Sequence, residues 1–282
     1  MPGRLETKKR KLALSAISKC HPRSKQGTRK QKHCLPRETY QDLERVTKQK
    51  GKALFTSLGC EDGAEHCLLD RSPLQKDVKE QLRKQYLRPK RPAAWEKKPD
   101  TWLDNYNIEH VMRQYEEAFP WFEFAGVFPM DFSAPDPYHK NGAPKCLHEQ
   151  LCKMVLQDEY DKGKRGIGFI FNLDPHYKGG SHWVALYIDI HDIKAPFIGY
   201  CDSYGMRTPP LIARFMRAFT LQIPATQLGF NARRFQYSNT ECGMYSLYFL
   251  ICMIHGITFK NFCKETTRDV TMLELRKILF GL

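Results

Sequence analysis

The segment 236–254, QYSNTECGMYSLYFLICMI, joins a polar first half to a strongly apolar second half. In the second half, apolar side chains recur at the spacing of an α-helix with a broad buried face. These side chains are Met244, Leu247, Tyr248, Leu250, Ile251 and Ile254. Cys242 and Gly243 stand where this helix is predicted to begin. The segment therefore predicts a buried helix with a thiol in its first turn.

A cysteine at the start of a helix has distinctive chemistry. Its thiol faces backbone N–H groups that have no partner within the helix, at the positive end of the helix dipole. Both effects favour the thiolate form. Gln236, six residues upstream of Cys242, supplies a side-chain N–H donor for an oxyanion. The pattern is typical of the nucleophile of a thiol hydrolase, and the alternative is a buried structural cysteine.

Two further polar side chains stand at the ends of predicted strands. His182 opens the strand predicted at 182–190. Asp202 closes the strand predicted at 195–203. If these strands are neighbours in one sheet, the imidazole and the carboxylate lie side by side. An imidazole between a thiol and a carboxylate can accept the thiol proton and later protonate a leaving amine. Together with the thiol and the amide, these residues predict a cysteine hydrolase site.

Helical and extended patterns alternate after residue 100. The predicted helices are 101–119, 147–157, 210–222 and 271–280, besides the helix after Cys242. The predicted strands are 166–173, 182–190, 195–203 and 232–238, with a loop or short edge strand at 124–135. This order predicts an α+β fold with a central mixed sheet flanked by helices. The mean hydropathy of −0.56 and the lack of a long apolar run predict a protein without a membrane span.

Charge is distributed unevenly along the chain. Residues 1–100 hold 26 Lys and Arg against 12 Asp and Glu, whereas residues 101–282 hold 19 of each kind. The net charge of +14 therefore belongs to the first third of the chain. We predict a disordered basic arm at 1–36, a helical N-terminal arm domain at 37–95 and a catalytic core at 96–282.

The basic arm suggests contacts with polyanions. Residues 1–34 carry eleven Lys and Arg and one acidic residue, with little apolar periodicity. They predict non-specific nucleic-acid binding through residues 1–34. The run at 8–11 is alternatively a nuclear-import signal, and the whole arm is alternatively a solvated tail.

Ten cysteines without a signal peptide predict free thiols in a reducing compartment and no disulfide scaffold. The Cys and His residues of the first third lack the ligand spacing that is usual for zinc. They are Cys20, His21, His33, Cys34, Cys60, His66 and Cys67. We therefore predict no metal and no cofactor. Cys201, beside Asp202, is interpreted as a packed strand residue.

Three stretches carry a resemblance to a known family. They are HWVALYID at 182–189, YCDSYG at 200–205 and QYSNTECGMYSL at 236–247. They resemble the adenovirus-endopeptidase and SUMO-protease clan of cysteine proteases. In that clan a His-Trp pair starts one strand, an Asp, Asn or Glu ends the next, and a Gln precedes Cys-Gly by six or seven positions. TWLDNYNI at 101–108 is similar to the Trp-Leu-Asn-Asp motif of the SUMO proteases, with Asp and Asn exchanged.

The chain resembles in particular the polyprotein-processing protease of African swine fever virus and related large DNA viruses. This likeness is carried by Asn107-Ile108, Pro129-Met130-Asp131-Phe132, Thr240-Glu241-Cys242-Gly243 and Leu58-Gly59-Cys60. It covers the predicted catalytic core and extends more weakly into the N-terminal third. It implies a papain-like core with an additional N-terminal arm domain.

The resemblance also implies roles for single residues. Trp183 would wall the substrate cleft, or alternatively would be a core aromatic residue. The swine fever type has Asn where this chain has Asp202, whereas the SUMO proteases have Asp. Asn239 is an alternative oxyanion donor, but Gln236 has the spacing of the family. The implied roles are Cys242 as nucleophile, His182 as base, Asp202 as orienting acid, and Gln236 with the backbone N–H of Cys242 as oxyanion donors.

The function implied by this resemblance is that of a cysteine endopeptidase of a large DNA virus. It would cleave structural polyproteins after Gly-Gly-type sites inside assembling particles, in the virion and the host cytoplasm. One alternative is an isopeptidase that removes SUMO or ubiquitin from lysines. A second alternative is a nucleic-acid-binding protein on a catalytically decayed protease scaffold.

Overall fold

The computed structural model of the protein describes residues 17–24, 33–137, 139 and 145–282. These residues form two compact units, which are described separately. The core unit comprises Trp102–Met272. The N-terminal unit comprises the described residues up to Thr101 together with Leu273–Leu282.

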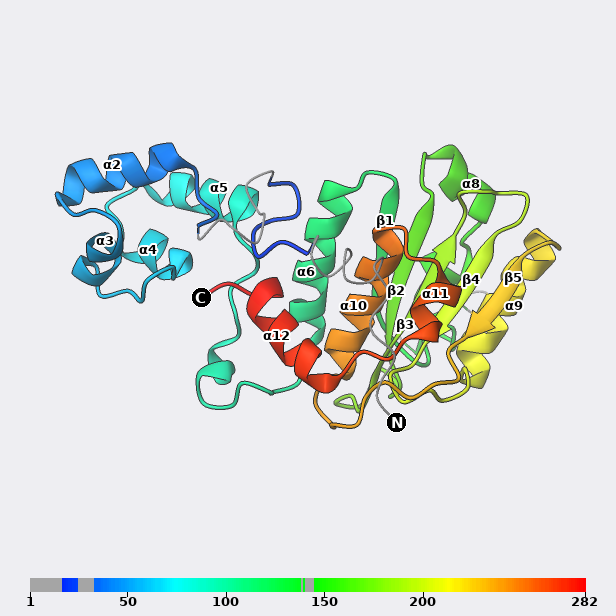
Figure 1. The fold of residues 1–282 in the computed structure, drawn as a ribbon. Coiled ribbons are helices and arrows are strands. Elements are labelled where there is room, and N and C mark those ends of the chain that lie inside the picture. Colours follow the sequence, from blue (N-terminus) through cyan, green and yellow to red (C-terminus); the bar gives the residue numbers. More distant parts are fainter. Residues whose placement is uncertain (1–16, 25–32, 138, 140–144) are drawn as a thin grey trace. The chain divides into compact units, whose positions relative to one another are not determined.

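A five-stranded mixed sheet forms the centre of the core unit, with the strands in sequence order (Figure 1). Strand β1 (Phe122–Pro129) runs parallel to β2 (Gly166–Asn172). Strand β3 (Trp183–Asp189) runs antiparallel to both β2 and β4 (Phe197–Cys201). Strand β5 (Gln227–Phe230) lies parallel to β4 at the other edge. The predicted α+β fold with a mixed sheet is thus confirmed.

Helices cover both faces of this sheet. The rings of Phe169 and Phe171 in β2 pack against Phe215 of α9 (Pro210–Gln222). Gly168, directly before Phe169, faces the opposite side, where a Cβ atom would lie 3.1 Å from Leu250 of α10 (Cys242–Ile254). Because successive strand residues point to opposite faces, α9 and α10 cover opposite faces of the sheet. Strands β2 and β3 are therefore almost wholly buried, as expected of strands covered on both faces.

Helix α10 (Cys242–Ile254) is buried along its whole length. The sequence predicted one broad buried face, but every residue of the helix is buried. The reason is its central position, since α10 contacts β3, α6 (Asn105–Ala118) and α11 (Phe259–Lys264). The first turn of α10 is thereby fixed within the core unit.

Other predicted elements need correction. The predicted strand 232–238 is wrong, and β5 lies before it. The backbone N–H groups of Phe235 and Gln236 both donate to the carbonyl of Ser203, so this stretch forms no strand ladder. The predicted helix 147–157 is two short helices, α7 (Glu149–Cys152) and α8 (Leu156–Asp161). They are separate because Val155 has an extended conformation, with φ −119° and ψ 121°. Helix α11 was not predicted.

The N-terminal unit is helical, as the sequence predicted for residues 37–95. Its helices are α2 (Arg37–Thr47), α3 (Lys52–Ser57), α4 (Glu65–Arg71), α5 (Lys76–Tyr86) and the 3₁₀ turn η1 (Ala93–Glu96). A small apolar cluster that includes Leu43, Phe55 and Leu68 holds them together. Helix α12 (Asp269–Leu279) belongs to the core unit up to Met272 and to the N-terminal unit from Leu273.

Most of the predicted disordered arm at 1–36 lies outside the described residues. The parts that are described, 17–24 and 33–36, pack into the N-terminal unit. Ile17 and Leu35 are buried, and Arg88 donates two hydrogen bonds to the carbonyl of Ser18, at 3.0 and 2.7 Å. These stretches are therefore integral to the unit, and the predicted domain boundaries stay predictions.

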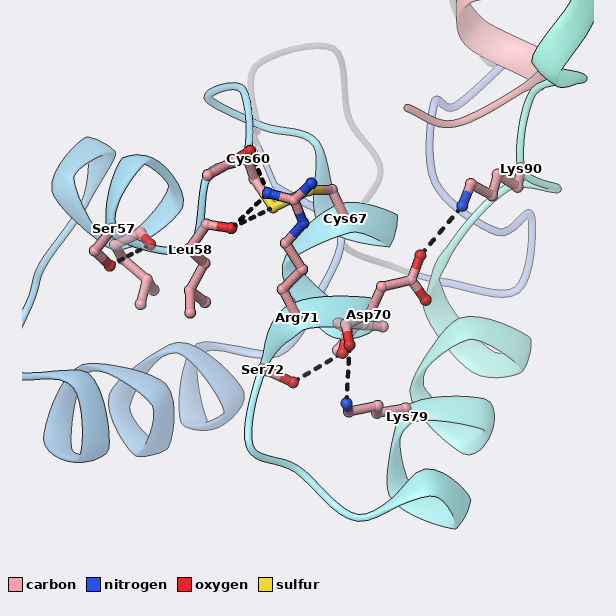
Figure 2. Close-up of a disulfide and its surroundings, with 12 residues drawn as sticks. Ser57, Leu58, Cys60, Cys67, Asp70, Arg71, Ser72, Lys79 and Lys90 are labelled. Carbon is pink, nitrogen blue, oxygen red and sulfur yellow. Dashed lines mark hydrogen bonds and ion pairs between the residues drawn. A yellow bond between two sulfur atoms is a disulfide. The ribbon is translucent and has the colours of Figure 1, made fainter.

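The expectation of free thiols is wrong for six of the ten cysteines. Three disulfides are present: Cys20–Cys34, Cys60–Cys67 and Cys146–Cys152. Figure 2 shows the second of them together with Arg71, whose guanidinium donates to the carbonyls of Leu58 and Gly59 at 3.0 and 2.8 Å. The fold closes these pairs because it brings their Cα atoms within 5.3–6.5 Å, a separation that sequence spacing does not reveal.

Within the described ranges, no three side chains of metal-binding type come together. No helix in the same ranges is long and apolar enough to span a bilayer.

Candidate active site

The ends of β3 and β4 bring the predicted imidazole and carboxylate together. His182 directly precedes β3 and Asp202 directly follows β4, and the two strands pair antiparallel with Ala185 opposite Cys201. His182 Nε2 lies 2.7 Å from Asp202 Oδ1. The other ring nitrogen, Nδ1, is left for Cys242, whose thiol also interacts with the imidazole. The structure thus brings together the three residues that the sequence singled out.

This arrangement favours a protonated imidazole. Burial by itself lowers the pKa of His182, but hydrogen bonds to Asp202 and Cys242 and their negative charges outweigh it. The net result raises the pKa of His182 from 6.5 to about 9. Because His182 and Cys242 are both buried, bulk water screens this interaction little. Near neutral pH the site therefore favours an imidazolium next to Cys242.

The carboxylate of Asp202 is held in place by its neighbours. Oδ1 accepts a hydrogen bond from the backbone N–H of Tyr204 at 2.8 Å in addition to the one from the imidazole. The fully buried Asn231 accepts from the backbone N–H of Asp202 at 2.8 Å and donates to its carbonyl at 2.6 Å. Side-chain hydrogen bonds therefore fix the backbone of the acid on both sides.

Gln236 is fully buried with a defined amide orientation. Its Nε2 donates to the carbonyl of Ser238 at 2.9 Å, and its Oε1 accepts from the hydroxyl of Ser203 at 2.6 Å. Because a carbonyl can only accept, the contact with Ser238 identifies the nitrogen side of the amide. One amide hydrogen remains for another acceptor. Asn239, the alternative donor, is exposed to solvent.

Gly243 allows a close contact at the start of α10. A Cβ atom at this position would lie 3.1 Å from Leu103 Cβ and 3.2 Å from Trp183 Cδ1. Trp183 is itself held by a hydrogen bond from its Nε1 to the carbonyl of Leu103, at 2.9 Å. A side chain at position 243 would therefore displace the tryptophan that follows His182.

A cavity of about 470 Å³ adjoins this tryptophan. It is lined by Trp102 and Trp183 and by the loop that leads into His182. In that loop Gly180 has a φ of +91°, and a Cβ there would lie 2.4 Å from Nδ2 of Asn172. Asn172 Oδ1 accepts from the backbone N–H of Ser181 at 3.2 Å. Trp183 thus lines a cavity and is also buried. The first is expected of a residue that walls a cleft, and the second of a core aromatic residue.

The sequence did not reveal every residue that supports the site. Ser203 and Tyr204 follow Asp202 directly, so their proximity could have been inferred from the motif. Asn231 carries no such signal, because it lies 29 residues further along the chain. The catalytic roles of His182 and Cys242 stay predictions.

Known proteins with similar sequences are viral proteases. No protein-family model matches the chain. A protein of Acanthamoeba polyphaga mimivirus named as a thiol protease is 30% identical over 192 residues, which cover 65% of this chain and 58% of that protein. A cysteine protease of African swine fever virus is 24% identical over 184 residues, covering 63% of this chain and 67% of the relative. The chain thus matches less than two thirds of the length of the mimivirus relative.

The fold also matches a solved structure. The crystal structure of the African swine fever virus protease superimposes with a TM-score of 0.71 at 22% identity. The match covers 95% of this chain and 97% of the other. Sequence and fold together therefore relate this chain to the cysteine proteases of large DNA viruses, as the motifs around His182, Asp202 and Cys242 indicated.

Proposed function

We propose that this chain is a cysteine endopeptidase of a large DNA virus that cleaves viral structural polyproteins after Gly-Gly-type sites. One observation carries the proposal: a buried imidazole lies between the thiol at the start of α10 and a fixed carboxylate. The names of the viral relatives support the same chemistry.

The geometry supports a two-step hydrolysis. The thiolate of Cys242 attacks the scissile carbonyl carbon, and the carbonyl oxygen becomes an oxyanion. The remaining amide hydrogen of Gln236 and the backbone N–H of Cys242 are the proposed donors to this oxyanion. His182 then gives its proton to the leaving amine, and a thioester remains on the enzyme. In the second step neutral His182 takes a proton from water, which hydrolyses the thioester.

The cavity beside Trp183 bears on substrate choice. Trp102 and Trp183 bring two indole rings to its lining, and glycine has no side chain to conflict with bulky rings. This supports a substrate with small residues before the cleaved bond. Some African swine fever virus relatives are named SUMO-1 cysteine proteases, so removal of SUMO or ubiquitin from lysine is the alternative function.

A comparison of substrates tests the proposal. The full chain is incubated with peptides of the form Gly-Gly-x and, separately, with SUMO and ubiquitin conjugates, with Cys242→Ser as the inactive control. We expect cleavage of Gly-Gly-x peptides without a requirement for a folded modifier. Faster cleavage of the conjugates by a large factor would favour the isopeptidase. Failure of both reactions would favour a decayed scaffold.

We further propose that residues 1–34 bind packaged nucleic acid in the virion, because the net charge of +14 belongs to the first third of the chain. The test deletes only residues 1–16, which carry five of the basic residues, since Cys20 and Cys34 form a disulfide. The truncated chain should bind DNA more weakly, with a smaller dependence on salt, and should cleave peptides as before. An unchanged salt dependence would rule out residues 1–16 as the contact.

A further inference from the structure

The ring of Tyr204 stacks on the imidazole of His182. The ring centroids are 4.6 Å apart and the planes are inclined by 12°. From this contact and those described next, we infer that Tyr204 is a positioning residue of the proposed active site, which orients the imidazole of His182 and stabilises its protonated form. This inference rests on the proposed function and assigns a role to a residue that the sequence motifs left without one.

Tyr204 also bonds to Asp202 and shares a hydrogen-bond acceptor with Gln236. Its backbone N–H donates to Asp202 Oδ1 at 2.8 Å, the same oxygen that binds the imidazole. Its hydroxyl donates to the carbonyl of Ser238 at 3.3 Å, and Gln236 Nε2 donates to that same carbonyl at 2.9 Å. One residue therefore links the acid, the base and the proposed oxyanion donor.

A tight turn fixes the position of Tyr204. The backbone N–H of Gly205 donates to the carbonyl of Asp202 at 2.8 Å, which closes a four-residue turn, Asp-Ser-Tyr-Gly. Asp at the first position and Gly at the last are typical of such turns. Gly205 has a φ of +71°, and a Cβ there would lie 2.6 Å from the backbone of Arg233. The backbone that carries the ring of Tyr204 therefore cannot easily shift.

The stack has an electrostatic consequence. The face of an aromatic ring carries partial negative charge and attracts a cation placed over it. An imidazolium on Tyr204 is therefore favoured over a neutral imidazole. The charged groups next to His182 are Asp202 and Cys242, and both favour the imidazolium as well. The guanidinium of Arg234 lies 5.1 Å from the centroid of the Tyr204 ring and is attracted by the same negative partial charge.

The chain offers a matched control at Tyr237. Arg234 lies 4.9 Å from the ring of Tyr237, nearly as close as it lies to Tyr204. Tyr237 is 74% exposed and has no ring contact with His182 among the described residues. Tyr237→Leu, like Tyr204→Leu, removes one of the two ring contacts of Arg234, but it leaves the stack of Tyr204 on His182 intact.

The test measures the imidazole directly and needs no substrate. Full-length chains with Tyr204→Leu, Tyr204→Phe or Tyr237→Leu are labelled with ¹⁵N-histidine and titrated by NMR, and His182→Gln assigns the signal. Tyr204→Leu should lower the pKa of His182 by about half a unit to one unit, the range expected from loss of a cation–π contact. Tyr204→Phe keeps the ring, and Tyr237→Leu keeps the stack, so both should leave this pKa within about 0.2 unit.

A second readout follows the thiol. Alkylation of Cys242 by iodoacetamide near pH 7 should slow by up to several-fold in Tyr204→Leu, because a less stable imidazolium returns its proton to the thiol more often and leaves less thiolate. An unchanged titration of His182 in Tyr204→Leu would overturn the inference. An equal shift in Tyr204→Phe or in Tyr237→Leu would also overturn it, because the stack would not be the cause. If the shift occurs but no peptide is cleaved, the proposed function fails and the stack remains.

Discussion

The two units of the molecule differ in how many of their cysteines form disulfides. In the N-terminal unit, four cysteines form two disulfides beside a small apolar cluster. The core unit has one disulfide, Cys146–Cys152, but Cys242 lies outside any disulfide, and its proposed role requires a free thiol.

This difference in the use of disulfides follows from the sizes of the two units. A small unit buries a smaller fraction of its surface and needs cross-links to offset the entropy of its unfolded chain. The core unit has a large aromatic and aliphatic cluster on its sheet, and with one disulfide it leaves four cysteines, Cys242 among them, outside any cross-link. Residue type alone therefore does not reveal the role of a cysteine, because the size of the surrounding core also matters.

Loss of the reactive thiol should have the largest effect. Cys242→Ser should lower peptide turnover by about 10⁴- to 10⁶-fold, because an unactivated hydroxyl replaces the thiolate. Thermal unfolding should change little. The matched control is Cys263→Ser, a half-buried cysteine outside the disulfides, which should retain activity. Near-normal turnover of Cys242→Ser would exclude this residue as the nucleophile.

The oxyanion donor should come next. Gln236→Ala should reduce turnover by about 10²- to 10³-fold, the usual cost of one missing donor. Asn239→Ala should cost much less, because Asn239 is exposed whereas Gln236 is buried with a fixed amide. Steady-state kinetics with one Gly-Gly-x peptide separates the two. A larger loss in Asn239→Ala would reverse the assigned roles.

Removal of the Cys20–Cys34 disulfide should affect only the N-terminal unit. Replacing both Cys20 and Cys34 by Ser should lower the free energy of unfolding of the N-terminal unit by about 3 kcal/mol, given the 14-residue separation. Hydrogen exchange should speed up in α4 and α5 but not in α10. Equal acceleration in α10 would show that the units do not unfold separately.

A pH profile should show the smallest effect. The pKa of His182 is raised to about 9, so the imidazolium is present below that pH and is lost as the pH rises through it. Turnover should therefore stay nearly constant from pH 7 to 8 and fall about tenfold for each unit well above pH 9. The measurement is kcat/KM against pH for a peptide without titratable groups. An alkaline limb near pH 7 would contradict the ion pair.

Much of the core could be predicted from the sequence because its elements have strong local signals. Helix α10 has a long apolar stretch, and β2 to β4 are rich in β-branched and aromatic residues. Strand β5 has the sequence QLGF and is largely exposed, so it shows neither alternation nor a buried run. The stretch 232–238 resembles a strand, yet the N–H groups of Phe235 and Gln236 bond to Ser203, 32 and 33 residues earlier, which no local pattern reveals.

The candidate site could be predicted where its residues lie in recognisable motifs at the ends of predicted strands and helices. His182, Asp202 and Cys242 meet as the sequence suggested, because two adjacent strand ends and a helix start converge. Asn231 was not predictable, since its contact with Asp202 depends on the path of the chain after β5. The disulfides were not predictable either, because pairing depends on distances that only the fold creates.

The N-terminal unit is discontinuous in sequence, and this has a consequence for its synthesis. Gly281 accepts a hydrogen bond from Arg91 at 2.9 Å and donates one to the carbonyl of Pro89 at 2.8 Å, while Phe280 packs on Trp95 at 4.9 Å. A ribosome makes these partners some 190 residues apart, and domains usually fold as they emerge. The segment up to Thr101 must therefore wait until Leu273–Leu282 is translated before the fold of this unit is complete.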